Sequence, residues 1–255
     1  DKLTYLIDSD LAQFRGSIVQ LTDKDNNTRR TRHLDYNTKD SVAVFSKGGA
    51  MRDKDGQIIE SMDGTYDSKL KQFTFKDRVN MFTDSIFVKT NTLTYDSPKN
   101  LATFGFNTNA WKDKNMLSAD GGWYNRDNEV FFFRNNVHVM SDSQEGWCDS
   151  LFFYRNTSDV EMLGKAQVTD TTRNVFGLAG RIHYKDSLSQ VTMTRKPAVI
   201  TETEERGVKD TIYLGAERLI YYSVPMFKVD SLALVDARKR QETLDIDPVG
   251  AFRKK

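Results

Sequence analysis

The side chains most often used in catalysis and metal binding are few in this chain. The three histidines, His33, His138 and His183, fall in different parts of the sequence, and Cys148 is the single cysteine. No His-x-x-His or Cys-x-x-Cys spacing is present to hold a metal. No Gly-x-Ser-x-Gly motif and no glycine-rich phosphate loop marks a nucleophile or a nucleotide site. The sequence therefore predicts a protein that is not an enzyme, with no catalytic residue, no metal and no cofactor.

The residues whose spacing does recur are aromatic. A tyrosine or phenylalanine returns every 29 to 31 residues and then after a longer interval, at Tyr5, Tyr36, Tyr66, Tyr95, Tyr124, Phe153, Tyr184 and Tyr221. Nine residues after each of the first seven stands a second large apolar residue, at Phe14, Phe45, Phe75, Phe104, Phe133, Met162 and Met193. A fixed offset kept through so many copies indicates an internal repeat.

Two columns of large apolar side chains can bind lipid. Burying an acyl chain is worth about 0.8 kcal/mol per CH₂, so leaving a 12-carbon chain in water costs roughly 10 kcal/mol. We expect the lipid-binding residues to be those of the interior columns, namely Tyr36, Phe45, Phe75, Tyr95, Phe104, Phe133, Phe153 and Met162. The alternative is a closed core filled by these same side chains, which periodicity alone favours. Small column residues such as Gly64 and Gly122 make room for a cavity, although they would equally complement large neighbours.

Each repeat is expected to be a pair of antiparallel strands. In the copy Leu93–Phe104, apolar residues stand two apart in each arm, which is the period of a half-buried strand, and the segment Asp96–Asn100 between the arms has turn chemistry. The connections are too short for crossover helices. The sequence therefore predicts an all-β fold, an elongated antiparallel stack of about seven two-stranded repeats with on the order of 14 to 16 strands.

A column of small residues lies five positions before the aromatic column, at Thr31, Ser61, Thr90, Ala119, Cys148, Ala179 and Ala216. Its parity is opposite to that of the aromatic column, so both columns face one interior only if the strand bends or bulges between them. A bend at the same place in every repeat predicts a folded-over sheet, shaped as a long V. In this arrangement Cys148 is a small buried residue.

Composition narrows the function classes. The chain has 255 residues, with 37 Lys and Arg against 36 Asp and Glu, so its net charge of +1 gives no global attraction to nucleic acid. Hydrophobic residues make up only 38%, yet 16 are Phe and 10 are Tyr, which indicates a sheet protein with a narrow apolar stripe and not a disordered chain. No apolar run approaches the ~20 residues that span a bilayer.

Two charged stretches could each be a binding site or an ordinary surface segment. Arg29, Arg30 and Arg32 lie on one expected strand and could meet phosphates, but a solvated strand face is the favoured interpretation. The segment Asp53–Gly56 is similar to the start of a calcium loop, but it lacks the helix and the spaced carboxylates of one. We therefore predict a turn there.

The repeats define the domain organisation. We predict a repeat domain over residues 1–224 and a C-terminal extension or cap over residues 225–255, as a short helix or a disordered tail. The longer interval before Tyr221 predicts an insertion at Thr201–Lys209, which is rich in charge and expected to be an exposed loop.

The template also resembles a known family. Leu-x-Tyr, a polar turn and Ala-x-Phe, followed by continuations such as Gly16-Ser17-Ile18 and Gly164-Lys165-Ala166, look like the OstA-like/LptA group of lipopolysaccharide transport proteins over about 220 residues. The resemblance implies a β-jelly-roll, or β-taco, in the periplasm of a Gram-negative cell. It also implies lipopolysaccharide as partner, with the lipid A acyl chains held in the apolar interior on the way to the outer membrane.

The two ends of such a stack carry a further expectation. An antiparallel stack leaves an unpaired edge strand at each end. Leu3 and Tyr5 are already in repeat register, so the start looks processed and a signal peptide is presumed removed or outside this sequence. We expect this end to pair head to tail with another Lpt-type β-jelly-roll protein or a second copy, and the segment after Pro225 to cap the other end.

Overall fold

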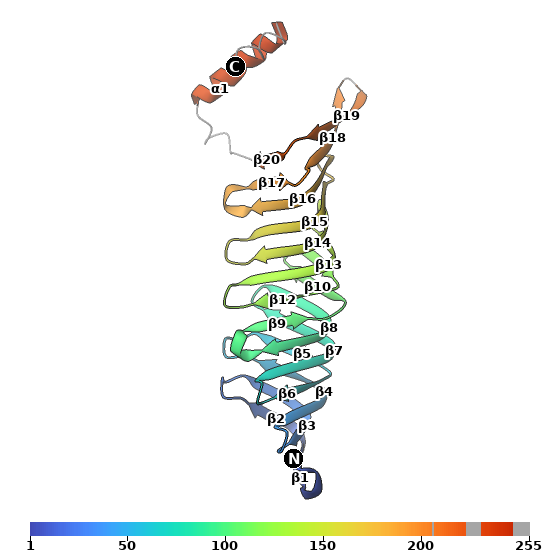
Figure 1. The fold of residues 1–255 in the computed structure, drawn as a ribbon, viewed down its shortest axis with the longest axis vertical. Helices are drawn as coiled ribbons and strands as arrows, with labels where there is room; N and C mark the ends of the chain where they lie inside the picture. The colour runs from blue at the N-terminus through green and yellow to red at the C-terminus, as the bar shows by residue number, and fades with distance from the viewer. Residues whose placement is uncertain (206, 223–230, 247–255) are drawn as a thin grey trace.

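The computed structural model describes residues 1–205, 207–222 and 231–246, and within them the chain forms one long antiparallel sheet of 20 strands (Figure 1). The strands are β1 (Lys2–Leu6), β2 (Leu11–Thr22), β3 (Thr28–Asn37), β4 (Val42–Arg52), β5 (Ile58–Ser61), β6 (Asp63–Asp67), β7 (Gln72–Thr83), β8 (Ile86–Asp96), β9 (Leu101–Phe104), β10 (Thr108–Lys112), β11 (Asn115–Ala119), β12 (Gly121–Asn125), β13 (Val130–Met140), β14 (Gln144–Tyr154), β15 (Asp159–Asp170), β16 (Val175–Lys185), β17 (Gln190–Thr194), β18 (Ala198–Glu205), β19 (Val208–Gly215) and β20 (Arg218–Tyr222). One helix, α1 (Ser231–Ile246), follows. The all-β, elongated, antiparallel prediction is confirmed.

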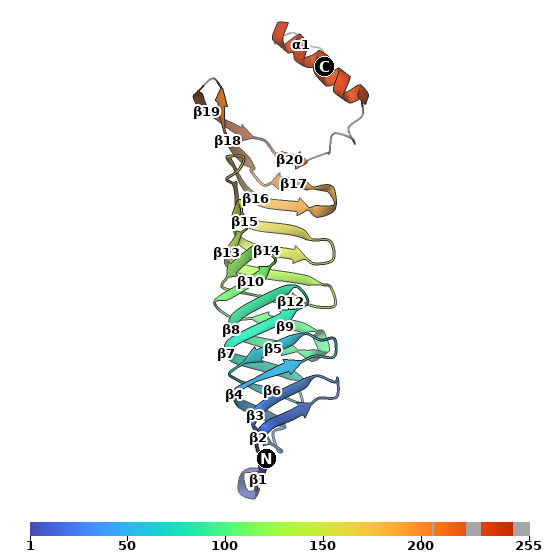
Figure 2. The same ribbon diagram turned by 180° about the vertical axis from the view of Figure 1, so that it is seen from behind.

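The sheet is folded lengthwise into two walls (Figures 1 and 2). The strand β4 shows the division, because its first half pairs with β6 and its second half pairs with β5. We call one side the aromatic wall, made of β1, β6, β9, β12, β17, β20 and one half of each long strand. The other side, the aliphatic wall, is made of β5, β10, β11, β18, β19 and the remaining halves.

The line between the walls is a crease, as the small-residue column predicts. The pairing register shifts there in strand pair after strand pair, for example between Lys76 and Val79 in β7 and between Arg134 and Val137 in β13. At these points two successive residues have positive φ, as at Asp77 and Arg78. The left-handed pair leaves the parity of its own strand unchanged, since Phe75 and Val79 are both buried. The parity changes in the partner strand β8, where the buried residues Thr90 and Leu93 stand three apart opposite the bulge. The predicted change of parity is therefore confirmed.

The hydroxyl groups of the crease have a structural role. The hydroxyl of Thr31 donates to the carbonyl of Gly48 at 2.8 Å, and that of Thr108 donates to the carbonyl of Gly105 at 2.7 Å. A bulge interrupts the hydrogen-bond ladder and leaves carbonyl groups without a strand partner. Small hydroxyl-bearing residues satisfy such carbonyls in a buried position, which explains Thr31, Ser61 and Thr90 in the first three places of the column.

On the aromatic wall the two predicted columns become continuous ladders. Tyr95 pairs with Phe73 on one side and with Ala102 on the other, and Phe104 pairs with Leu93 and Gly122. Each large side chain thus lies between neighbours of the same column, and large residues often face small ones. The same register continues to Tyr221, which pairs with Val191.

The strand number exceeds the expected 14 to 16. Five of the long strands are split at the crease into two separate ones, namely β5/β6, β9/β10, β11/β12, β17/β18 and β19/β20. The repeat is unchanged by this, since each split strand still contributes one half to each wall. The higher strand number thus reflects interruptions of five strands at the bend, and the order in which the strands pair is as predicted.

The prediction of an exposed loop at Thr201–Lys209 is wrong. β18 and β19 form a hairpin whose pairing runs from Ala198 and Gly215 outward to Glu205 and Val208. Val199, Ile200 and Thr201 favour strand conformation, and the charged residues beyond them remain in solvent on a two-stranded ribbon. The insertion thus lengthens one hairpin of the aliphatic wall.

The C-terminal part is described only in α1. The predicted domain boundary near residue 225 lies in 223–230, outside the described residues, as do residues 247–255. Within the predicted extension 225–255, Ser231–Ile246 is helical. The division into domains and the capping role stay predictions.

Candidate functional site

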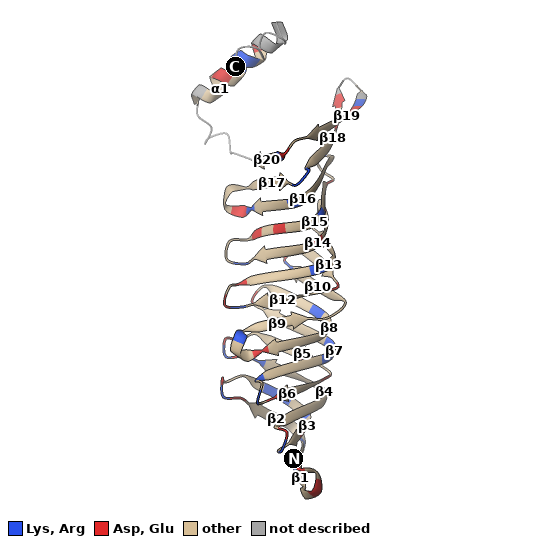
Figure 3. Ribbon diagram, in the orientation of Figure 1, with Lys and Arg blue, Asp and Glu red and all other residues tan. Residues whose placement is uncertain are grey.

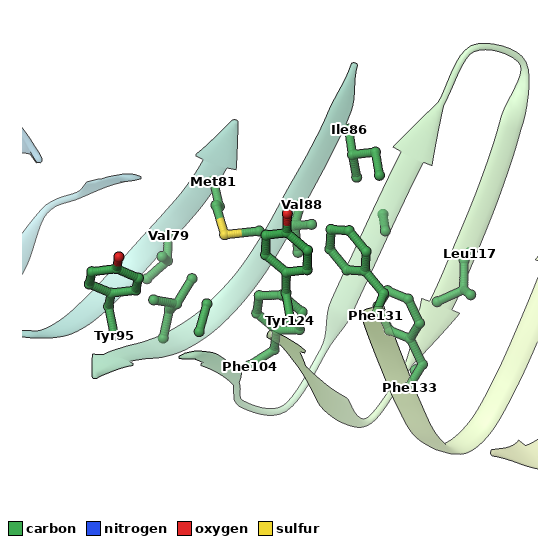
Figure 4. Packing of buried hydrophobic residues seen from close by; sticks show 14 of the residues in the cluster. Val79, Met81, Ile86, Val88, Tyr95, Phe104, Leu117, Tyr124, Phe131 and Phe133 are labelled. Atoms are coloured by element: carbon green, nitrogen blue, oxygen red, sulfur yellow. The ribbon is translucent and has the colours of Figure 1, made fainter. Parts of the chain in front are cut away.

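The interior between the two walls is one continuous hydrophobic cluster that extends from Leu34 to Met193. The aromatic wall supplies the two ladders, and the aliphatic wall supplies methionine, valine, isoleucine and leucine side chains. Figure 4 shows Tyr95 and Phe104 on one side of this interior and Val79, Met81 and Val88 on the other. The fold therefore creates a single apolar path along the length of the stack.

All eight side chains predicted to bind lipid lie in this interior. Phe45, Phe75, Tyr95, Phe104, Phe133 and Met162 are buried, and Tyr36 and Phe153 are partly buried against the same cluster. The residues that the sequence analysis left out are those of the aliphatic wall, among them Met51, Ile59, Val79, Met81, Val88 and Leu117. Alternation of apolar residues in Val79–Met81 and Ile86–Val88 was the available signal for them.

The aromatic rings fill much of the interior with contacts to one another. Tyr124 stacks on Phe131 with ring centroids 4.0 Å apart, and Tyr66 stacks on Phe73 at 4.2 Å. Phe104 stacks with Phe133 at 6.2 Å (Figure 4). Such pairs contribute about 0.5–1.5 kcal/mol beyond their burial. The middle of the stack is thus a packed interior.

Gly122 shows how small column residues are used. It lies between Phe104 and Phe133 in the ladder, and a Cβ placed on it would be 2.0 Å from the carbonyl oxygen of Phe132. Glycine is therefore required by the close approach of the neighbouring backbone. At this rung the small residue complements its large neighbours and leaves no cavity of its own.

Replacement of Gly122 by alanine is expected to lower the free energy of unfolding by about 1–3 kcal/mol, because the added methyl overlaps a backbone group that side-chain motion cannot relieve. Urea denaturation followed by tryptophan fluorescence measures the effect. Gly215→Ala is the matched control, since a Cβ at Gly215 meets nothing within 4 Å. Equal losses in the two variants would contradict the steric explanation.

Opposite the crease, the turns of the two walls meet along a line that we call the seam. In the described part of the chain, cross-wall ion pairs lie on it at three heights. Lys71 binds Asp25 at 3.0 Å, Arg126 binds Asp53 and lies 3.4 Å from Asp55, and Arg155 binds Asp84. In each pair the cation comes from a turn of the aromatic wall and the carboxylate from a turn of the aliphatic wall. The seam is therefore closed by charge pairs at three heights of the stack.

The Asp53 pair is the most buried of these ion pairs. The Asp53 side chain is 1% exposed, and that of Arg126 is 20% exposed. One carboxylate oxygen of Asp53 also accepts hydrogen bonds from the backbone N–H groups of Gln57 at 2.8 Å and Asp55 at 3.0 Å. Burial raises the pKa of Asp53, and Arg126 and these two N–H groups lower it in part. The predicted turn at Asp53–Gly56 is confirmed, and it holds this carboxylate in place.

Tyrosine hydroxyl groups line the inner edge of the seam. The Tyr124 hydroxyl donates to Glu129 at 2.9 Å, and the guanidinium of Arg155 contacts both Glu129 and Tyr124. Burial raises the pKa of Tyr95 and of Tyr124. The rings thus belong to the apolar interior, while their polar ends reach the charged seam, which explains tyrosine in this column and phenylalanine in the deeper one.

Sequence reasoning did not find the seam. Arg126 and Arg155 share a place two residues after the aromatic column, but spacing does not show which carboxylate from another repeat, such as Asp53, each one meets. The burial of Arg29, by contrast, could be predicted from the sequence. Arg29 stands two residues before Thr31 on the same strand, so both side chains point into the interior, and Arg29 is 1% exposed. The predicted solvated face is therefore wrong for Arg29, while Arg30 and Arg32 are exposed.

The interior opens at both ends of the stack. Within the described residues, β1 pairs only with β2 and β20 only with β17, so each leaves one edge free. Inward-facing ladder residues become exposed there, with Leu3 at 64% and Tyr221 at 56%. The prediction of an unpaired edge strand at each end is confirmed, and both ends present ladder residues without the next rung.

Outside the interior and the seam, the described residues form no charged patch or metal-binding cluster (Figure 3). Acidic and basic residues are interspersed along the stack (Figure 3). In the described ranges no group of three or more His, Cys, Asp or Glu residues could hold a metal ion, and no helix there is long and apolar enough to cross a membrane. Cys148 is buried as predicted, and burial raises the pKa of its thiol to about 12. A thiol with this pKa is not a nucleophile at neutral pH.

Comparison with known proteins gives a family match at the N-terminal end. Residues 1–89 match the model of a family described as OstA-like protein. No curated protein matches the chain. Among solved structures, the crystal structure of LptH from Pseudomonas aeruginosa, described as the LptA-homologous periplasmic component of a lipopolysaccharide transport device, is similar at 13% sequence identity and a TM-score of 0.26. The alignment covers 61% of this chain and 93% of that one.

The matched segment contains the first three repeats, from Tyr5 through Phe75. The later repeats continue both aromatic-wall ladders to Tyr221 in unchanged register. The resemblance to the OstA-like family is thus confirmed over residues 1–89, and the rest of the sheet extends that family's segment with further rungs of the same construction.

Proposed function

We propose that this chain is a periplasmic, non-enzymatic carrier of lipopolysaccharide, which holds lipid A acyl chains between its two walls as part of a bridge to the outer membrane. The observation that carries the proposal is the continuous apolar interior, which opens at both ends of the stack onto unpaired edge strands. The family match over residues 1–89 supports it. The ends fit head-to-tail pairing with another Lpt-type β-jelly-roll protein or a second copy, because pairing would cover the exposed ladder residues Leu3 and Tyr221.

Loading requires that the two walls separate. Phe75 is fully buried and Phe104 is 2% exposed, so an acyl chain enters the middle of the stack only if these rings move apart from the opposite wall. The seam is the line along which such an opening would occur, since ion pairs and a hydrogen bond between Asn27 and Ser97 join turns of the two walls there. The apolar contacts given up by the walls would be replaced by contacts with acyl chains, at about 0.8 kcal/mol per CH₂.

Such a carrier needs no catalytic group. Transfer of an acyl chain from a bilayer into an apolar interior is nearly neutral in free energy, because both environments exclude water from it. Direction must then come from a driven step in another protein. The three histidines and Cys148 take no part in the proposed function.

The second candidate is a structural scaffold with a self-filled core. The stacking of Tyr124 on Phe131 at 4.0 Å and the fit of Gly122 between Phe104 and Phe133 favour it, because these contacts fill the interior without a ligand. The two functions differ in one respect that can be measured. A carrier exchanges its interior contacts for lipid, whereas a scaffold keeps them.

Site-specific photo-crosslinking in a lipopolysaccharide-producing host tests the proposal. A photoreactive phenylalanine analogue at position 75, 104 or 133 is expected to form a lipopolysaccharide adduct, since Phe75, Phe104 and Phe133 point into the interior. Adducts are detected as a mass-shifted band that reacts with an antibody to lipopolysaccharide.

Position 132 supplies the matched control for this experiment. Phe132 neighbours Phe133 on β13 but points to the outer face, where it packs against Trp123 and Phe152. We expect no adduct at position 132. A folded protein that gives no adduct at any of the three interior positions, or gives the same yield at position 132, would show that the interior does not carry the lipid.

A further inference from the structure

The aliphatic wall has a ladder of its own, and one of its members is charged. In register, Leu21 pairs with Arg29, Arg29 pairs with Met51, and Met51 pairs with Ile59. The ladder continues through Met81 and Val88 to further apolar or small residues. Arg29 thus occupies a position that its ladder neighbours fill with leucine and methionine, and it faces the interior assigned to acyl chains.

The Arg29 guanidinium has few partners in this position. Its Cζ atom lies 3.5 Å from the ring centroid of Phe45 and 5.4 Å from that of Phe75. One terminal nitrogen donates a long hydrogen bond of 3.5 Å to the Ser61 hydroxyl, while Nε and the other terminal nitrogen are buried without a partner. In the described part of the chain, no carboxylate lies within 4.0 Å to form an ion pair with it.

A buried cation of this kind is costly. Burial lowers the pKa of Arg29 to about 9, so the side chain still carries its charge at neutral pH. Two rings offer a cation–π contact, which compensates only part of the lost hydration and gives neither unpartnered nitrogen a hydrogen-bond acceptor. Buried charges in proteins are normally paired. The described part of the chain therefore supplies no partner of negative charge for Arg29.

The position of Arg29 gives such a partner a way in. Arg29 lies on β3, and the half of β2 that covers it on the aliphatic wall is itself an edge, because β1 pairs only with the other half of β2. One strand and the half-buried Leu21 therefore separate the guanidinium from the open N-terminal end of the interior. Glycine at position 49 lets the guanidinium lie against the backbone of β4, since a Cβ there would be 3.0 Å from a terminal nitrogen of Arg29.

We propose that Arg29 binds the anionic group, a phosphate or carboxylate, of an amphiphile whose apolar chain lies in the interior near the N-terminal opening. Nε and the unpartnered terminal nitrogen would donate charge-assisted hydrogen bonds to that oxyanion. The inference rests on the proposed function for the apolar part of the ligand, whereas the anion site itself rests only on the placement of Arg29. An anion site at Arg29 would make this part of the interior bind anionic amphiphiles more tightly than neutral ones.

Equilibrium binding to the full-length chain, measured by calorimetry, tests the inference with three probes. Dodecyl phosphate and dodecyl maltoside, both below their micelle concentrations, share one chain and differ in charge, and inorganic phosphate has no chain. We expect dodecyl phosphate to bind about tenfold more tightly than dodecyl maltoside. In Arg29→Met the ratio is expected to fall below about twofold, while Arg29→Lys retains part of it.

Arg30→Met is the matched control, because Arg30 is exposed on the opposite face of the same strand, where it bonds Gln20. It is expected to keep the tenfold ratio. The thermal midpoint of Arg29→Met without ligand is expected to equal or exceed that of the unmodified chain, because an unpaired buried charge has been replaced by an apolar side chain of similar length. A clear fall in this midpoint together with an unchanged ratio would assign Arg29 a purely structural role and overturn the inference.

The remaining outcomes separate the inference from the proposed function. Equal binding of both dodecyl ligands keeps the apolar carrier and overturns the anion site. Binding of inorganic phosphate that is lost in Arg29→Met, without binding of either dodecyl ligand, keeps the anion site and identifies a free anion as its ligand. Absence of binding by all three probes overturns both.

Discussion

Replacement of Arg126 by alanine is expected to lower the free energy of unfolding at pH 7 by about 3 kcal/mol, since it leaves the buried Asp53 carboxylate without its cation. Removal of one partner of a buried ion pair typically costs about 3–5 kcal/mol. We expect the lower end of this range, because Asp53 keeps its two backbone hydrogen bonds in this variant. Urea denaturation followed by circular dichroism gives the value.

The loss should depend on pH in a direction that the structure fixes. Burial raises the pKa of Asp53 above its ordinary 3.8, so the stability that this group contributes is fully present below pH 3.8 and decreases as the pH rises through the raised pKa. Arg126 lowers that pKa, and its removal therefore raises the pKa further and deepens the loss. The deficit of Arg126→Ala is expected to be small near pH 4 and to grow toward pH 7.

The exposed pair between Lys114 and Asp142 provides the control. Its side chains are 80% and 70% exposed and lie within the aliphatic wall. Lys114→Ala is expected to cost less than about 1 kcal/mol with little dependence on pH. If Arg126→Ala behaves in the same way, the seam pair does not hold the two walls together.

Replacement of Phe104 by alanine is the second change with a large expected effect. Phe104 is 2% exposed and stacks with Phe131 and Phe133, so its removal leaves a cavity that the sheet backbone cannot close. We expect a loss of about 3–5 kcal/mol in the free energy of unfolding. The same urea titration measures it.

Phe106→Ala is the matched control for this prediction, because Phe106 lies two residues away and is 67% exposed. It should change stability by no more than about 0.5 kcal/mol. A loss below 1 kcal/mol for Phe104→Ala would mean that the ring borders an open groove in the lipid-free protein, contrary to its burial.

The Phe104 variant also separates the carrier from the scaffold. An apolar cavity in a packed interior can be refilled by a small apolar ligand. If the interior accepts acyl chains, dodecyl maltoside below its micelle concentration should restore part of the lost stability by binding the folded state. A scaffold whose walls never separate would show no recovery, because the ligand would have no access to the cavity.

The seam and Arg29 both help to distinguish a carrier from a scaffold. Charge pairs close the walls opposite the crease, and an unpaired cation lies inside them near one end. A scaffold has no evident use for a buried charge that lowers its stability. A carrier of anionic amphiphiles does, because ligand binding supplies the missing counter-charge.

Much of the architecture could be predicted from residue spacing. The offset of nine residues between Tyr95 and Phe104 places the tyrosine and the phenylalanine on two adjacent ladders, and the parity of the small column predicts the crease. These predictions succeed because strand pairing is local here, so that each rung pairs with the next along the chain. The prediction at Thr201–Lys209 failed because charge was given more weight than the strand preference of the β-branched residues beside it.

What the sequence determined by itself is thus the repeat, its two apolar columns, the bend between the walls and, through these, an interior able to bury apolar groups. Only the tertiary structure decided which distant charges meet, as Asp53 and Arg126 do across the seam, and that Arg29 lies inside among apolar neighbours. The physical reason is that backbone pairing and side-chain alternation have short periods that a sequence displays directly. Closure of the V instead joins turns from different repeats, and those contacts depend on how far the two walls lean toward each other.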